Sequence, residues 1–286
     1  MKCDLCPRKC LVDRKKGEKG ICGQTENLKV ARAALHFWEE PCISGDAGSG
    51  AVFFSGCPLH CVFCQNENIA NGTVGKEISL ERLVDIFLEL QEKRANNINL
   101  VTPGHFVPQI VKALDQARKE GLTLPVVYNT SSYETVDTIK MLEGYVDIYL
   151  PDFKYMSPVL SKKYSHAPDY AEVAKAAIAE MVRQTGKAVF VNGDEDNLIL
   201  RGTIVRHLTL PGCMADSMQI LKYLHDTYGD MIYISIMNQF TPLSNLEKYP
   251  ELNRRITDEE YETLVDYAIE IGIENGFIQE GNTAEE

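Results

Sequence analysis

The stretch GAVFFSGCPLHCVFCQN, Gly50 to Asn66, joins a short apolar run to a loop that holds three cysteines. The run GAVFF, rich in valine and phenylalanine, predicts a buried strand. Cys57, Cys61 and Cys64 follow at once with the spacing C-x3-C-x2-C. A structural zinc ion and an ordinary iron–sulfur cluster each take four protein ligands. The loop therefore either lacks a ligand or leaves one coordination position open.

Downstream of this loop, short apolar runs alternate with amphipathic helical patterns. In SLERLVDIFLELQEK, residues 79–93, apolar side chains recur at i, i+3, i+4, i+7 and i+8, which predicts a helix. Six such strand–helix units predict an α/β fold with a parallel sheet, fewer than the eight units of a closed TIM barrel. We expect an open, partial (β/α)6 barrel with its chemistry beyond the C-terminal strand ends. The expected strands are residues 50–54, 97–102, 124–130, 145–150, 202–210 and 231–237.

The sequence also predicts where some helices begin and end. Ser131 with Glu134, and Thr257 with Glu260, have the spacing of a capping box, which predicts a helix start at each pair. Gly121 is expected just beyond the end of a helix.

Composition limits the class of protein. The net charge of −12 and the lack of clustered Lys and Arg argue against a nucleic-acid partner. No apolar run is long enough to span a bilayer, and MKCDLCPRK has no signal-peptide core, so we expect no membrane partner and a cytoplasmic location. In that reducing compartment, nine cysteines indicate metal binding or catalysis rather than disulfides.

The three-cysteine loop has competing interpretations. Three cysteines in a loop rich in Gly, Pro and His are poor core material. Zinc is an alternative with His60 as a fourth ligand, but His60 is adjacent to Cys61, which is a cramped arrangement for one tetrahedral ion. A cluster bound by three thiolates fits better, because it leaves one iron free for a substrate or cofactor.

The loop and several later segments carry a resemblance to a known family. The motif C-x3-C-x2-C after the first strand of a partial barrel is similar to the radical S-adenosylmethionine (SAM) superfamily. More narrowly, GSGAVFFSGCPLHCVFCQN, NINLVTPGHFVPQI, YLPDFKYM and IVRHLTLPG resemble the pyruvate formate-lyase activating enzyme-like subgroup. The match runs from Trp38 onward and is most specific in the cysteine loop.

This resemblance implies an anaerobic oxidoreductase mechanism. Cys57, Cys61 and Cys64 would bind three irons of a 4Fe-4S cluster, and the amino and carboxylate groups of SAM would chelate the fourth. An electron from a donor such as flavodoxin or ferredoxin would cleave SAM into methionine and a 5′-deoxyadenosyl radical, which abstracts a hydrogen atom. The protein would supply orientation and exclusion of solvent.

The resemblance also suggests contacts to SAM at the first two strand ends. Phe63 occupies the position of an aromatic ring that lies against adenine. After the second strand the superfamily usually has a Gly-Gly-Glu type segment, whereas this chain reads TPGH. The methionine amine is therefore expected to meet the Thr102 hydroxyl, a backbone carbonyl or His105, for which helix capping or a surface loop is the alternative.

Three further strand ends match the family more closely. Asn129, Thr130 and Ser131 stand where the subgroup has a Thr-Asn-Gly type segment that contacts a carboxylate or ribose. Asp152 and Lys154 match an Asp-x-Lys pair at the methionyl end of SAM, with a monovalent cation at the aspartate or a plain ion pair as alternatives. A further residue, Arg206, resembles an arginine that contacts the SAM carboxylate or ribose.

Two isolated features stand outside these motifs. HFWEEPCISG, residues 36–45, holds the single tryptophan, Trp38, with Glu39 and Glu40. It is expected to form a packed clasp, with a lid over the site or substrate contacts as the alternative. Cys213 is expected to be a buried, inert thiol, with a thiol donor facing the cavity as the alternative.

Four cysteines at the beginning of the chain predict a separate metal knuckle. Cys3, Cys6, Cys10 and Cys22 complete a tetrahedral donor set for zinc, with a second 4Fe-4S cluster as the alternative. The chain is accordingly divided into a cysteine-rich extension at 1–45, a radical SAM barrel at 46–280 and a disordered tail at 281–286.

The sequence is compatible with more than one class of substrate. Resemblance points to a glycine of a partner enzyme, as in glycyl-radical activation, because a partial barrel is open laterally to a protein loop. Another peptide or a small metabolite is the alternative within the same chemistry. A zinc-stabilised, non-catalytic binding module is the alternative of another class.

Overall fold

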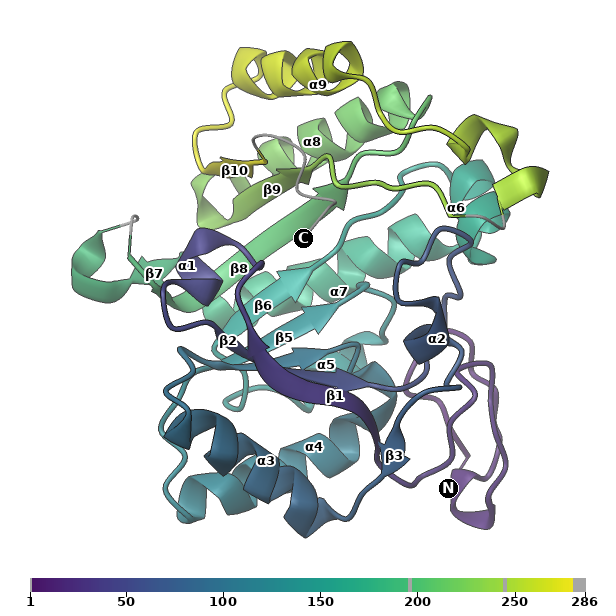
Figure 1. Ribbon diagram of the computed structural model, residues 1–286. Helices are drawn as coiled ribbons and strands as arrows, with labels where there is room; N and C mark the ends of the chain where they lie inside the picture. The colour runs from purple at the N-terminus through teal and green to yellow at the C-terminus, as the bar shows by residue number, and fades with distance from the viewer. Residues whose placement is uncertain (1, 195–196, 244–245, 280–286) are drawn as a thin grey trace.

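A largely parallel sheet in the order β10-β9-β8-β6-β5-β4-β2-β1-β3 organises the chain, with β7 paired to β8 (Figure 1). The computed structural model describes residues 2–194, 197–243 and 246–279. The strands are β1 Lys29–His36, β2 Ser49–Phe54, β3 Lys76–Glu77, β4 Ile98–Val101, β5 Val126–Thr130, β6 Ile148–Pro151, β7 Val189–Phe190, β8 Ile199–Leu208, β9 Tyr233–Met237 and β10 Gly276–Ile278.

Helices cover the outer face of this sheet (Figure 1). The helices, of which α1 lies inside the barrel and not on this outer face, are α1 Pro41–Ser44, α2 Glu67–Ala70, α3 Leu80–Glu92, α4 Val107–Lys119, α5 Val136–Lys140, α6 Pro158–Ser165, α7 Tyr170–Thr185, α8 Met214–Tyr228 and α9 Asp258–Glu270. Short 3₁₀ turns lie at Arg14–Lys16, Gly104–Phe106, Val191–Gly193, Gly229–Met231, Leu246–Lys248 and Pro250–Leu252. Among the described residues, no helix combines the length and hydrophobicity that a bilayer crossing requires.

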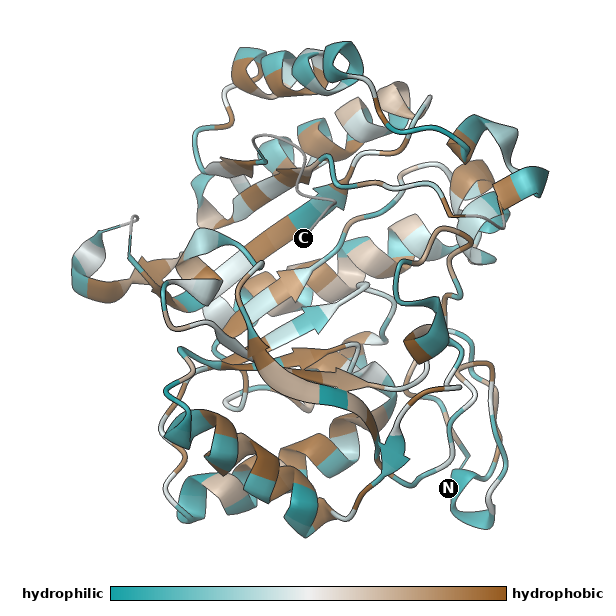
Figure 2. Ribbon diagram, in the orientation of Figure 1, coloured by the Kyte–Doolittle hydropathy of each residue, from teal (hydrophilic) through white to brown (hydrophobic). Residues whose placement is uncertain are grey.

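The predicted fold class is confirmed. Neighbouring strands from β2 through β4, β5, β6, β8 and β9 pair in parallel, and the sheet does not close on itself. Apolar runs form these strands because both sheet faces are covered, and Figure 2 shows hydrophobic residues where the long outer helices adjoin the sheet. The result is an unclosed α/β partial barrel.

Some elements differ from the sequence expectation. β1 pairs antiparallel with β2, from Val30 opposite Phe54 to His36 opposite Ser49, and so extends the sheet before its first parallel strand. β10 adds a parallel strand after β9. The capping box predicted at Thr257 and Glu260 is confirmed at the start of α9.

The predicted capping box at Ser131 and Glu134 is wrong. The next helix, α5, begins after Thr135, whose hydroxyl accepts the Thr138 backbone N–H. Glu134 instead turns inward, where it is buried and accepts a hydrogen bond from the Thr130 hydroxyl. A capping-box spacing is short enough to arise in a loop whose carboxylate has another partner.

α1 fills the lower part of the barrel interior. Cys42 and Ile43 are buried against inward-facing residues of three barrel strands, including Val127, Ile148 and Ile204. This small apolar cluster is separate from the main core between the sheet and the outer helices. α1 thereby packs inside the barrel and fixes the two glutamates that precede it.

Residues 2–28 wrap around one end of the barrel with little regular structure (Figure 1). Arg8 donates hydrogen bonds to the carbonyls of Pro58 and Ser165, at 3.0 and 3.1 Å. The hydroxyl of Thr138 donates to the Leu5 carbonyl at 2.7 Å. The proposed tail at 281–286 lies outside the described residues.

Candidate active site

The cysteine loop leaves β2 through a tight turn at Gly56, whose φ is +93°. A Cβ at this position would lie 2.5 Å from the Cys22 carbonyl oxygen, so only glycine fits. His60 does not serve the loop as a metal ligand here. Its ring nitrogens lie 3.0 Å from Asn71 Oδ1 and 2.8 Å from the Ile21 carbonyl oxygen, which occupies both.

A cleft of about 220 Å³ opens at the C-terminal strand ends. Cys57, Cys61 and Cys64 all line it. Eight of the nine residues predicted to contact SAM line the same cleft, although they come from the cysteine loop and four separate strand ends. These are Phe63, Thr102, Asn129, Thr130, Ser131, Asp152, Lys154 and Arg206.

His105 is the predicted SAM contact that does not line the cleft. Its side chain is buried, and Nε2 lies 2.7 Å from the Ser55 carbonyl oxygen. The ring instead lines the pocket of the N-terminal cysteines. Burial lowers the pKa of His105 to about 3, so the ring is neutral.

The three loop thiols are half-buried in the wall of the cleft. Burial raises the pKa of Cys57 to about 12 and that of Cys64 to about 11. Burial also raises the pKa of Cys61, against the opposing effects of Lys154 and of a hydrogen bond from the Ser165 hydroxyl to its sulfur, at 3.0 Å. Buried thiolates need cationic partners, which iron ions supply, so this donor set fits a cluster.

Opposite the cysteines lies a buried network of charges. Lys154 Nζ is 2.6 Å from one oxygen of Asp152, and Arg206 Nε is 3.3 Å from the other. Burial opposes the charged form of Asp152, but Lys154 and Arg206 outweigh it and lower the pKa. The plain ion pair anticipated for Asp152 and Lys154 is thus present on the wall of the cleft.

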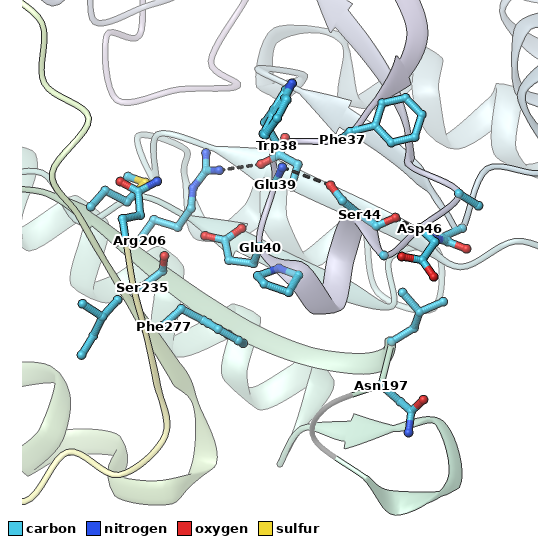
Figure 3. Close-up of a pocket in the computed structure, with 18 of the residues that line it drawn as sticks. Phe37, Trp38, Glu39, Glu40, Ser44, Asp46, Asn197, Arg206, Ser235 and Phe277 are labelled. Carbon is cyan, nitrogen blue, oxygen red and sulfur yellow. Dashed lines mark hydrogen bonds and ion pairs between the residues drawn. The ribbon is translucent and has the colours of Figure 1, made fainter. Parts of the chain in front are cut away.

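Glu39 completes this network from the other side of the barrel. One carboxylate oxygen is 2.8 Å from Arg206, and the other accepts hydrogen bonds from the amides of Asn99 and Asn129, at 3.0 and 3.2 Å. The remaining nitrogen of Arg206 donates to Asn129 at 3.0 Å. Figure 3 shows Arg206 and Glu39 pointing toward one another.

The N-terminal cysteines line a second, smaller pocket. Cys3, Cys6, Cys10 and Cys22 surround it together with His105 and Glu134, and it shares Thr102 and Ser131 with the cleft. Burial raises the pKa of Cys6 to about 12. Over the described residues, no three or more His, Cys, Asp or Glu side chains are arranged as ligands of a single metal ion. The cysteines of each group therefore line one common pocket, and metal binding by either group is proposed below.

Other candidate residues lie away from the cleft. Cys213 precedes α8, and burial raises its pKa to about 11, which keeps it a thiol. His207 is buried between the Phe153 carbonyl and the Ser217 hydroxyl, at 2.8 and 2.9 Å. Trp38 is exposed over 63% of its surface, unlike a packed clasp residue.

An unclosed α/β barrel with three cysteines after its first parallel strand defines a class of cluster-binding enzymes. The family model of the radical SAM superfamily matches residues 51–198, just over half of the chain. The chain belongs to the radical SAM superfamily, whose members bind an iron–sulfur cluster and SAM.

Known proteins agree with this assignment. An uncharacterized protein of Methanocaldococcus jannaschii is 27% identical over 93% of this chain and 74% of its own length. SuiB of Streptococcus suis, solved with SAM bound, superposes with a TM-score of 0.54 and 13% identity over 80% of this chain and 49% of its own. HydG, a maturase of the [FeFe]-hydrogenase, superposes with a TM-score of 0.53 and 15% identity, over 79% of this chain and 50% of its own. The chain spans about half the length of these two solved chains.

Sequence patterns did not identify several residues around the cleft. Asn99 interrupts the apolar strand β4, and a polar residue inside an apolar run could have indicated a side chain that faces a polar site. Glu39 stood out only as an acidic neighbour of Trp38, and its link to Arg206 joins residues 167 positions apart. Ser165 lies in a helix that no sequence pattern marked.

Proposed function

We propose that this protein is a radical SAM enzyme with a 4Fe-4S cluster on Cys57, Cys61 and Cys64 and SAM in the adjoining cleft. The observation that supports it is the convergence of these cysteines and eight expected SAM contacts on one cleft. When bound, the cluster and SAM supply the electron and the 5′-deoxyadenosyl radical. The chain's own residues hold, orient and enclose these groups.

The side chains suggest distinct roles in holding SAM. Phe63 is buried against Phe240 and Tyr155, with ring centroids 6.0 and 6.5 Å away, so its ring has a fixed orientation for stacking. Asp152 and Lys154 provide both signs of charge for the methionyl end. All three nitrogens of Arg206 already have protein partners, which favours a positioning role over the bidentate carboxylate contact expected from the sequence.

For the substrate, we propose hydrogen abstraction from a peptide, with a glycine of a partner enzyme as the first candidate. The support is the resemblance of four segments to the activating enzyme-like subgroup and the lateral opening of the sheet. A small metabolite is the alternative. Flavodoxin or ferredoxin is the proposed electron donor.

We further propose that residues 1–45 form an extension of the 46–280 barrel, onto which its β1 and α1 pack, and that Cys3, Cys6, Cys10 and Cys22 bind zinc. A second 4Fe-4S cluster is the alternative. The support is that all four thiols line one pocket. Metal analysis decides, because zinc and iron differ in absorption and in stoichiometry.

Anaerobic preparation of the full chain tests the main proposal. We expect about four irons per chain on the barrel loop, and release of 5′-deoxyadenosine when SAM and dithionite are added. Cys61→Ala should lose both, whereas Cys213→Ala, a thiol outside the cleft, should keep both. Protein that contains zinc alone would favour the binding module, and iron without deoxyadenosine would contradict the chemistry proposed.

A further inference from the structure

A third cavity, of about 830 Å³, adjoins the cleft on the open side of the barrel (Figure 3). Residues 37–41 and 44–47 form one wall, and the region of β9 and β10 forms the other. Arg206, Met237 and Gln239 line both the cavity and the cleft. A molecule bound in the cavity would therefore lie beside the place where SAM is proposed to bind.

The charged side chains lining this cavity are mostly acidic. Glu39, Glu40 and Asp46 contribute carboxylates, and Arg206 is the sole Lys or Arg among the described lining residues. Arg206 is already neutralised, since its nitrogens contact Asp152, Glu39 and Asn129. The described lining of the cavity thus has no free cation of its own.

Glu40 is the unmatched member of this group. It is only 7% exposed, and its Oε2 has no hydrogen-bond partner within the described part of the chain. Figure 3 shows Glu40 below the Arg206–Glu39 pair, on the side of Ser235. Burial raises the pKa of Glu40, Arg206 lowers it and Glu39 raises it further. A hydrogen bond with Ser235 and the charge of Arg206 offset part of the cost of burying this carboxylate, and a ligand cation at Oε2 would offset the rest.

The balance of charged groups around Arg206 also points to Glu40. The connected network holds two cations, Lys154 and Arg206, and two carboxylates, Asp152 and Glu39, which balance. Glu40 adds a third carboxylate without an ion pair. Among the described residues, the cavity side of the network therefore holds one more carboxyl group than cations.

We propose that Glu40 binds a cationic nitrogen of the substrate, an ammonium or guanidinium group such as that of a lysine- or arginine-bearing peptide. This rests on the proposed function, because it names the substrate class of the same site. Phe37 and Trp38, exposed over 49% and 63% of their surfaces, also line the cavity.

Trp38 makes the proposal directly measurable, because it is the single tryptophan of the chain and lines the cavity. Its fluorescence is followed in anaerobic, cluster-loaded full-length protein during titration with Nα-acetyl-lysine methylamide. The neutral comparison is Nα-acetyl-norleucine methylamide, which has the same stem without the ammonium. We expect the lysine probe to bind at least about 10-fold more tightly, in line with a buried charge pair.

Variants assign this preference to one residue. Glu40→Gln, which keeps shape but removes charge, should bring the two probes to similar affinity. Asp46→Asn, which removes an exposed carboxylate on the same wall, should keep the preference within about 2-fold, as expected of a solvent-screened charge. The comparison of the two probes on the wild-type protein still tests the preference for a cation where Glu40→Gln does not fold.

Equal affinity of the two probes for the wild-type protein would overturn the proposal, as would an unchanged preference in Glu40→Gln. SAM also carries an ammonium, so it is titrated alone. Loss of SAM affinity in Glu40→Gln would assign the carboxylate to the cofactor and overturn the substrate assignment. Probe binding does not require SAM cleavage, so a failure to release deoxyadenosine would leave this result intact and distinguish the two proposals.

Discussion

Ser165 at the end of α6 shows how one hydroxyl can act on the proposed cluster. Its Oγ lies 3.0 Å from the Cys61 sulfur and 2.8 Å from the Tyr155 hydroxyl. Hydrogen bonds to cluster sulfurs stabilise the reduced, more negative state and raise the reduction potential. The backbone around the hydroxyl is fixed from outside, because Arg8 binds the Ser165 carbonyl.

Ser165→Ala should therefore lower the midpoint potential of the cluster. One hydrogen bond of about 1 kcal/mol corresponds to about 40 mV for one electron. Redox titration followed by electron paramagnetic resonance gives the value, and Ser165→Thr, which keeps a hydroxyl, should change it less. Ser161→Ala is the matched control, since Ser161 is buried in the same helix but bonds Pro158. An equal shift in both alanine variants would argue against a specific effect of Ser165.

At the scale of elements, periodicity located the parallel strands and their helices but not the pieces added at the edges. α3 falls within its expected range, residues 79–93, because it has an apolar face against the sheet. β1 was missed because its residues are mostly half-exposed and show no regular alternation. β10 is three residues long and depends on pairing with β9. Local patterns cannot report such pairing.

The capping box of α9 gives a test at this scale. The Thr257 hydroxyl accepts the Glu260 backbone N–H at 3.1 Å, and the Glu260 carboxylate accepts the Thr257 N–H at 3.0 Å. Thr257→Ala should lower the free energy of unfolding by about 1 kcal/mol, whereas Thr257→Ser should cost little.

Denaturant unfolding measures both variants. A hydrogen bond from Arg254 is the main cause that lowers the pKa of Glu260 to about 2. The carboxylate is thus ionised in the folded protein at neutral pH, and the loss in Thr257→Ala should be the same at pH 6 and pH 8. Equal stability of Thr257→Ala and Thr257→Ser would show that the cap does not stabilise α9.

For the whole molecule, the sequence predicted which residues share the cleft better than what each one contacts. Strand ends meet at one edge of a parallel sheet, so eight of nine expected SAM contacts converge. Their partners depend on packing between distant segments. Glu39 reaches Arg206 because α1 fills the barrel, and His105 faces the N-terminal cysteines because that segment folds over the loop after β4.

The N-terminal segment also braces the cysteine loop, which predicts that the two proposed metal sites depend on each other. Arg8 bonds the Pro58 carbonyl, and His60 contacts the Ile21 carbonyl. Cys10→Ser should remove the N-terminal metal and loosen this brace. Losing about 1 kcal/mol of local stability makes opening of the cysteine loop about 5-fold more frequent. We expect iron loss to an added chelator to accelerate accordingly, as followed by the decay of cluster absorbance.

Arg8→Ala separates the brace from the metal, because it cuts the contact to the loop and leaves all four N-terminal cysteines in place. It should keep the N-terminal metal yet lose cluster iron faster than the wild type. Lys9→Ala, at the neighbouring exposed position, is the matched control and should behave as the wild type does. Unchanged iron loss in both Cys10→Ser and Arg8→Ala would mean that the cysteine loop holds its shape without the N-terminal segment.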